Sequence, residues 1–226
     1  MKSQLKLISV IIFLLTTNLL QAQVKWTFEI SGGIQMNVPL PLIIRQSTYP
    51  DIRIRSAKFD AESFKTPFFN VWRFSRWNKN RAWEFEGIHQ KLFLSNKTPE
   101  IQNFSISHGL NIQTINRAWK LNNGFIPRIG VGVAVTHPES TIRNKEFNEH
   151  QGFLKLGYYI SGPTLNLGIA KRCTITKNFF LSCEAKTTAT YARVPVFNGK
   201  ADVYNIAFQF TLGLGVNFAN SLETEM

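Results

Sequence analysis

The side chains best suited to chemistry in this 226-residue chain are its histidines, of which the sequence has four. Three of them, His89, His108 and His137, lie near the ends of segments in which apolar and polar residues alternate. If neighbouring segments pair as hairpins, the simplest registers place His108 opposite both His89 and His137. Directly opposed residues of a sheet have Cβ atoms about 4.5–5.5 Å apart. The pattern therefore predicts a row of three imidazoles on the apolar face of a sheet.

Such a row could share a proton, a phosphate or a metal ion. Two residues, Lys91 and Glu139, are expected one step further along the same face, where they would bind a lipid headgroup. The candidate catalytic residues are His89, His108, His137, Ser105 and Ser107. Two observations argue against acyl hydrolysis. Both serines have the polar parity, opposite to that of the histidines, and no G-x-S-x-G motif occurs. The alternative is that the histidines form a polar rim, or that a bulge at Gly87 or Gly109 turns some of them inward. No residues have the spacing of a metal-ligand set, and no cofactor is expected.

The elements that must position these residues are eight segments of period-two alternation. The most regular is 202–218, in which the even positions are large and apolar and the odd positions are polar or small. A strand of this length can cross a bilayer, which takes about 9–11 residues at a tilt. The predicted strands are 24–36, 67–77, 81–94, 102–120, 124–138, 153–171, 178–194 and 202–218.

Long and short connections alternate between these strands. The short ones are 78–80, 121–123 and 172–177, and the long ones are 37–66, 95–101, 139–152 and 195–201. Outer-membrane barrels have short periplasmic turns and longer outer loops. The sequence thus predicts an all-β fold, an antiparallel up-and-down transmembrane β-barrel of eight strands with both termini in the periplasm. Because residues 51–59 also alternate, two further strands within 37–66, and so a ten-stranded barrel, remain the alternative.

Aromatic residues of apolar parity are expected at both ends of the strands, as two membrane-interface belts. The polar parity defines the interior, and in 102–120 it places Asn111 and Gln113 there. An eight-stranded barrel is just wide enough for side chains to fill it, and buried charges must pair. We therefore expect a filled interior rather than a pore. The expected network in this lumen consists of Glu29, Arg73, Glu84, Glu86, Arg128, Glu184 and Lys186.

The first 22 residues have the pattern of a signal peptide, with Lys2 and Lys6 before an apolar run and Ala22 before the expected cleavage point. The barrel domain would then occupy residues 23–226. The formal net charge of +12 either reflects solvated turns and loops or favours contact with the phosphates of lipopolysaccharide and of anionic lipids. Export makes nucleic acid a poor candidate partner. The expected partners are membrane lipids, lipopolysaccharide and the barrel-assembly machinery, and the expected state is a monomer.

The whole layout resembles the small eight-stranded outer-membrane barrels, which include the transmembrane part of outer membrane protein A, its adhesion-related relatives, and the lipid A deacylase and palmitoyltransferase barrels. This resemblance implies an outer-membrane location and an envelope-structural or surface-interaction role. Its alternative implication is an outer-leaflet lipid-modifying enzyme that uses the histidines. The deacylases carry an H-x-S arrangement, whereas in S-I-S-H-G-L, residues 105–110, serine precedes histidine. A third hypothesis is a soluble periplasmic barrel that binds a hydrophobic ligand.

Overall fold

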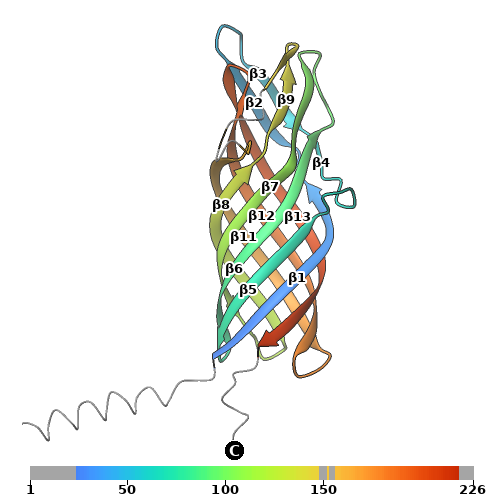
Figure 1. Ribbon diagram of the computed structural model, residues 1–226, viewed down its shortest axis with the longest axis vertical. Helices are drawn as coiled ribbons and strands as arrows, with labels where there is room; N and C mark the ends of the chain where they lie inside the picture. The colour runs from blue at the N-terminus through green and yellow to red at the C-terminus, as the bar shows by residue number, and fades with distance from the viewer. Residues whose placement is uncertain (1–23, 148–151, 153–155, 219–226) are drawn as a thin grey trace, which may run out of the picture.

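Eight strands close into an antiparallel barrel in the computed structural model, which describes residues 24–147, 152 and 156–218 (Figure 1). Within those ranges, no helix is long and apolar enough to cross a membrane. The predicted signal peptide, residues 1–22, lies outside the described residues. In barrel order the strands are β1 (Val24–Asn37), β5 (Asn70–Asn78), β6 (Arg81–Leu94), β7 (Ile101–Trp119), β8 (Phe125–Thr136), β11 (Tyr159–Thr174), β12 (Phe179–Val196) and β13 (Gly199–Phe218).

The ends of the sheet meet at a seam between β1 and β13, where Trp26 lies opposite Phe218 and Asn37 opposite Ala207. Each of the eight predicted segments is a strand of this barrel. Both described chain ends, Val24 and Phe218, lie at one end, the terminal end, where the connections are short (Figure 1). The fold class predicted from the alternation is therefore confirmed.

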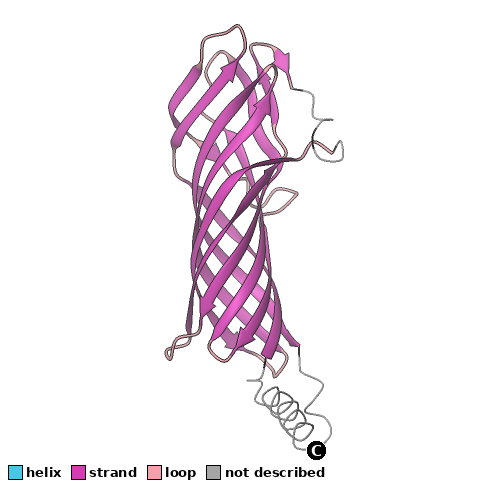
Figure 2. Ribbon diagram, turned by 90° about the vertical axis from the view of Figure 1, so that its left-hand side faces the viewer, coloured by secondary structure: helices cyan, strands magenta, loops and turns pink. Residues whose placement is uncertain are grey.

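Among the described residues, five shorter strands extend the wall beyond the barrel at the outer end, away from the termini (Figure 2). They are β2 (Leu40–Gln46), β3 (Ile52–Ala57), β4 (Phe59–Asp60), β9 (Glu139–Ile142) and β10 (Lys145–Glu146). They pair with the outer ends of β13, β6 and β7 or with one another. We call these five strands and the strand ends they pair with the collar. The two further strands considered within 37–66 exist, but they build the collar and do not enlarge the barrel.

The exterior of the barrel is apolar between two aromatic belts. In β13, Leu212 points outward and is 71% exposed, while the neighbouring Thr211 points inward and is 3% exposed. The belt at the terminal end contains Trp83, Phe125, Phe179 and Phe218, all exposed. The belt at the outer end contains Tyr191 and Tyr204, which are partly or fully exposed. Tyr159, also expected there, lies opposite the buried Thr136 because the register shifts after Ile160, so it shares the inward face. The predicted inversion, with apolar residues outside and polar ones inside, is thus present in this section, which we call the spanning section.

The interior of the spanning section holds a buried charge network. Among the described residues, this network joins four carboxylates to four cations. The carboxylates are those of Glu29, Glu84, Glu86 and Glu184, and the cations are Arg73, Arg128, Arg172 and Lys186. Arg73 is central: its guanidinium reaches Glu86 and Glu184 at 2.5 Å and Glu29 at 3.3 Å. All seven predicted members are buried and connected, and Arg172 joins them through Glu29 at 2.9 Å.

The interior changes along the barrel axis from charged to apolar. Above the charges, Gln90 bonds to Asn205 at 3.2 Å and to Gln209 at 2.9 Å. Beyond these amides lies an aliphatic and aromatic core within the collar. This core includes Leu42, Ile44, Ile52, Leu92, Leu94, Ile101, Phe104, Ile106, Ile142, Val194, Val196 and Val203.

The expected orientation of β7 is wrong. Asn111 and Gln113, expected inside, are half-buried on the outer side, whereas Ile112 and Thr114 are buried inside. The prediction fails because the interior is apolar at this level of the barrel. Leu110 and Ile112 are apolar, which predicts the lipid-facing side for them, but they pack inside, in the core of the collar.

Candidate functional site

The candidate site is built on a bulge in β7. Gln90 pairs with Leu110 and Leu92 with Ile106, so that β7 has three residues where β6 has one. Gly109, within the bulge, has φ of +122°, a backbone conformation that favours glycine. An added Cβ there would lie 2.6 Å from the side chain of Asn111. The bulge turns the two residues before Gly109, a serine and a histidine, to the outer face.

Three side chains meet beside this bulge at the outer end of the barrel. His108 Nδ1 lies 2.9 Å from Glu139 Oε1, and His137 Nδ1 lies 4.0 Å from the same oxygen. The two imidazole rings are 4.9 Å apart, and the ring of Tyr158 packs against His137 at 5.1 Å. Ser107 donates a hydrogen bond to Glu139. We call His108, His137 and Glu139 the rim cluster.

The expected row of three histidines is formed only by His108 and His137. His89 pairs with Asn111 instead of His108, and its Nδ1 lies 2.8 Å from Asn111 Oδ1. The simple register misses this because the bulge places two extra residues of β7 between the expected partners. Gly109, whose missing Cβ would contact His89 at 2.8 Å, separates His89 from the rim cluster.

Two other predicted residues are not on the surface. Lys91 is 3% exposed, and its ammonium donates to the carbonyl of Lys65 at 2.8 Å. It therefore does not face lipid headgroups, contrary to expectation, because the segment before β5 covers it. Ser105 is 2% exposed, so it has no open path to a substrate.

The rim cluster does not have the geometry of a catalytic relay. In such a relay the acid bonds one imidazole nitrogen of the base and the nucleophile bonds the other. Here Ser107 Oγ lies 3.2 Å from His108 Nδ1, the nitrogen that already faces Glu139. The catalytic roles expected for His89, His108, His137, Ser105 and Ser107 stay predictions.

A second outer-end feature lies on the opposite wall, over β2, β12 and β13. Tyr191 and Tyr204 are directly paired, with ring centroids 5.3 Å apart. Just above them, Asp202 accepts hydrogen bonds from Arg193 at 2.7 Å, from the Tyr191 hydroxyl at 2.8 Å, and from Arg45. Burial alone would raise the pKa of Asp202, but these hydrogen bonds lower it from 3.8 to about 2. The side chains of Arg45 and Arg193 remain 46% and 52% exposed.

We call Arg45, Arg193 and Lys200, which lies opposite Arg45 in the ladder, the basic rim. The sequence alone does not predict it. The signal was present, since Asp202 and Lys200 share the outward parity of Tyr204 in β13. The two arginines, however, come from β2 and β12, and only the fold brings them together.

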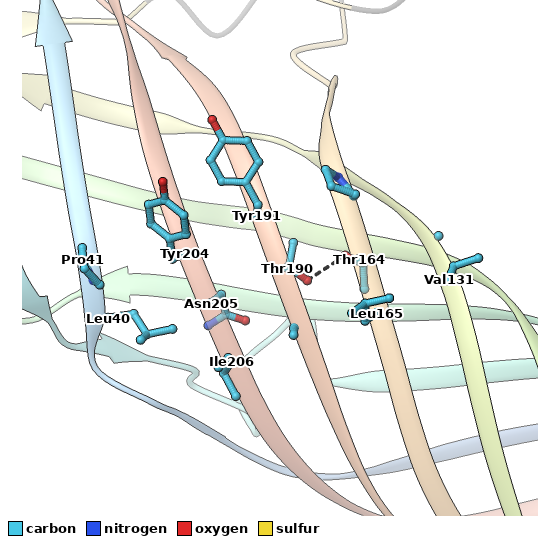
Figure 3. Close-up of a pocket in the computed structure, with 13 residues that line it drawn as sticks. Leu40, Pro41, Val131, Thr164, Leu165, Thr190, Tyr191, Tyr204, Asn205 and Ile206 are labelled. Carbon is cyan, nitrogen blue, oxygen red and sulfur yellow. Dashed lines mark hydrogen bonds between the residues drawn. The ribbon is translucent and has the colours of Figure 1, made fainter.

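Directly below the basic rim the outer face is hollowed (Figure 3). The hollow has a volume of about 600 Å³, and Leu165, Tyr191, Tyr204 and Ile206 are among the residues that line it. Leu40 and Pro41, at the start of β2, form the side of the hollow that is at the left in Figure 3. A hollow lined by aliphatic and aromatic side chains on an apolar exterior can receive a hydrocarbon chain.

No protein-family model matches the chain, and no curated protein is significantly similar to it. Among solved structures it is similar to the outer membrane protein AlkL in lipid bilayers, with 11% identity and a TM-score of 0.47 over 88% of this chain and 92% of that one. It is also similar to Ail, the attachment invasion locus protein of Yersinia pestis, in complex with the heparin analogue sucrose octasulfate, with 8% identity, a TM-score of 0.39, and 86% and 97% coverage.

A further similarity is to Neisserial surface protein A, with 10% identity, a TM-score of 0.35, and 86% and 97% coverage. The class of small outer-membrane barrels that the sequence layout resembles is thus also found among these structures. With identities of 8–11% and TM-scores below 0.5, these similarities say nothing about what this chain binds.

Proposed function

We propose that the protein is an integral outer-membrane barrel with a closed interior that displays its collar at the cell surface. The observation that carries this proposal is the inverted distribution of side chains. Apolar residues such as Leu212 are exposed between two aromatic belts, while charged residues such as Arg73 are buried. Water would penalise that exterior, whereas a bilayer favours it. The same inversion disfavours the soluble ligand-binding alternative.

The buried contents support a closed barrel rather than a channel. Acidic and basic groups face one another in the charge network, and amides and then apolar side chains follow above them. Arg73 is 1% exposed and bonds to three carboxylates from three different strands. Such groups cross-link the wall, which supports an interior without a continuous aqueous path for ions.

Electrophoresis and conductance test this proposal together. The barrel folded in detergent should migrate differently before and after boiling, and it should fractionate with membranes after a carbonate wash. In planar bilayers it should give no unitary conductance steps, and Lys177→Gln, in an exposed turn at the terminal end, serves as a control for surface charge. Recovery in the soluble periplasmic fraction would overturn the membrane assignment, and stable conductance would overturn the closed interior.

The partner we propose is the phosphorylated lipid of the outer leaflet, lipopolysaccharide. The basic rim lies just above the tyrosine belt, at the level where headgroup phosphates meet the interface, and the hollow below it can receive an acyl chain. Arginine forms bidentate contacts with phosphate oxygens. Arg45 and Arg193 are each half exposed, so their guanidiniums can contact a phosphate while still bonding to Asp202.

Lipid retention in native mass spectrometry tests this partner. Lys200→Gln leaves the Asp202 contacts intact, so that a change in binding is not caused by loss of structure. By itself it should reduce the lipopolysaccharide retained by the purified barrel, whereas Lys177→Gln should not. Adding Arg193→Gln, which also removes a hydrogen bond to Asp202, should reduce the retained lipid further. Equal retention by all variants would overturn the proposal. A lipid A mass spectrum from cells with and without the protein should be unchanged; a lost or gained acyl chain would favour the lipid-modifying enzyme instead.

A further inference from the structure

We propose that the rim cluster is a binding site for a divalent transition-metal ion, with Zn²⁺ as the representative. His108 and His137 would supply imidazole nitrogens, and Glu139 would supply a carboxylate oxygen. The three possible ligand atoms already lie within 4.8 Å of one another. Two histidines and one carboxylate form a recurrent ligand set for metals of this class.

The distances fit a metal that draws the three atoms together. Zinc binds nitrogen and oxygen at about 2.0–2.2 Å, so tetrahedral ligands lie roughly 3.3 Å apart. His108 Nδ1 and Glu139 Oε1 are 2.9 Å apart, and His137 Nδ1 is 4.0 Å from that oxygen. The side chain of His108 is 63% exposed, so solvent leaves room for the small rotamer change that completes the approach.

An unsatisfied nitrogen supplies the second observation. His137 Nδ1 is buried and has no hydrogen-bond partner among the described residues, although the ring is fixed between His108 and Tyr158. A buried polar atom without a partner is unfavourable by about 1–3 kcal/mol. A metal ion placed between Glu139 and the two imidazoles would satisfy this nitrogen.

The backbone fixes the ligands before any ion arrives. His108 is held outward by the β7 bulge, and His137 follows the last residue of β8, where its amide bonds to the carbonyl of Gly109 at 3.2 Å. Glu139 opens β9 and is oriented by the hydroxyl of Ser107. A hydrogen bond of this kind, behind a metal ligand, orients it for binding. The imidazole nitrogens favour zinc, copper or nickel over calcium and magnesium, which prefer oxygen ligands.

Titration calorimetry of the folded barrel in detergent, without a polyhistidine tag, tests the proposal. Zn²⁺ should bind with a stoichiometry of one, and Mg²⁺ or Ca²⁺ at the same concentration should not. His137→Ala and Glu139→Gln should each weaken Zn²⁺ binding by more than about tenfold. Glu139→Gln is the safer variant for folding because the amide can still accept the bond from Ser107.

The matched control is His89→Ala, which removes the neighbouring imidazole from the adjacent strand and leaves the rim cluster intact. It should bind Zn²⁺ like the natural protein, and every variant is compared after its boiling-sensitive mobility shows that the barrel has folded. The proposal is overturned if the natural protein shows no saturable binding. It is also overturned if Glu139→Gln binds as tightly, or if His89→Ala loses as much affinity as His137→Ala.

Discussion

The buried side chains of the spanning section are charged, whereas those of the collar are aliphatic and aromatic, although the same strands run through both. In β13 the inward residues are Gln209 and Thr211 in the spanning section and Ala201 and Val203 in the collar. The outward residues change in the opposite sense, from apolar to Lys200 and Asp202. Inward and outward residues alternate without interruption along β13. Only the polarity of each face is exchanged between the two regions.

This contrast shows that the surroundings decide which face carries the apolar residues. Where lipid surrounds the barrel, the apolar side chains face out and the interior is stabilised by hydrogen bonds and ion pairs. Where water surrounds the collar, the apolar side chains face in and their burial stabilises it. The paired Tyr191 and Tyr204 lie at the change-over. A side chain that is polar at one end and apolar at the other is suited to that boundary.

Arg73→Ala is expected to have the largest effect on the spanning section. It leaves Glu29, Glu86 and Glu184 buried without their shared partner, which should reduce the free energy of unfolding by about 3–5 kcal/mol. Denaturant unfolding in lipid vesicles measures this loss. The control is Arg76→Ala, on the outward side of the same strand, with an expected change within about 0.5 kcal/mol. A similar small change for Arg73→Ala would mean that the network does not hold the wall together.

Leu92→Ala tests the collar, because this side chain is 0% exposed within the apolar core. Removing it should cost about 2–4 kcal/mol through lost burial and a residual cavity. Hydrogen exchange of the amides in β2, β3 and β9 should accelerate more than that of the amides in the spanning section. The comparison variant is Phe64→Ala, at a side chain that is 72% exposed. Uniform acceleration along the whole barrel would show that the two regions unfold as one unit.

Leu212→Arg tests the exterior of the spanning section. A cation at the lipid-facing midplane should destabilise the barrel by about 2–4 kcal/mol in vesicles. Ile175→Arg, in the turn at the terminal end, should cost less than about 1 kcal/mol because it lies beyond the apolar band. If the two substitutions were equivalent, the apolar band would not be in contact with hydrocarbon.

Among these changes, acidification should have the smallest effect on the collar. The hydrogen bonds that lower the pKa of Asp202 from 3.8 to about 2 stabilise the folded state above pH 4. This contribution, about 2 kcal/mol at most, should be lost as the pH falls from about 4 to about 2. Exchange of the β2 and β13 amides followed against pH should show the loss in the natural protein. In Asp202→Asn the corresponding step should be absent, and its persistence would assign the step to another group.

Much of this fold could be predicted because the alternation is strict in β1 and β13 and because short connections mark the terminal end. The orientation of β7 could not. A parity rule assumes one interior chemistry along a strand, and β7 passes from the apolar collar at Ile112 to the polar spanning section at Thr114. The sequence between those two residues does not show that the interior changes from apolar to polar. That change depends on side chains from β2, β9 and β12.

The charge network was predictable and the rim cluster only in part. Charged residues of inward parity in a narrow barrel have no partners except one another, so their pairing follows from the strand assignment. The proximity of His108 and His137 also follows from a hairpin register. The separation of His89 from the rim cluster, and the position of Glu139 beside it, depend on the bulge that contains Gly109. The size of this bulge cannot be predicted by counting residues between paired strands. The basic rim required the collar topology, which brings Arg45 to β13.

The seam between β1 and β13 also determines when the protein can exist as a folded molecule. These strands come from opposite ends of the described chain, and joining them closes the largest loop among the described pairings. Until they join, β1 and β13 each present an edge of unpaired amides and carbonyls, which hydrocarbon cannot satisfy. A chain that stops before β13 has no partial structure that is stable in the bilayer. Synthesis must therefore reach β13 before insertion becomes favourable, so that closure of the barrel is a condition of insertion.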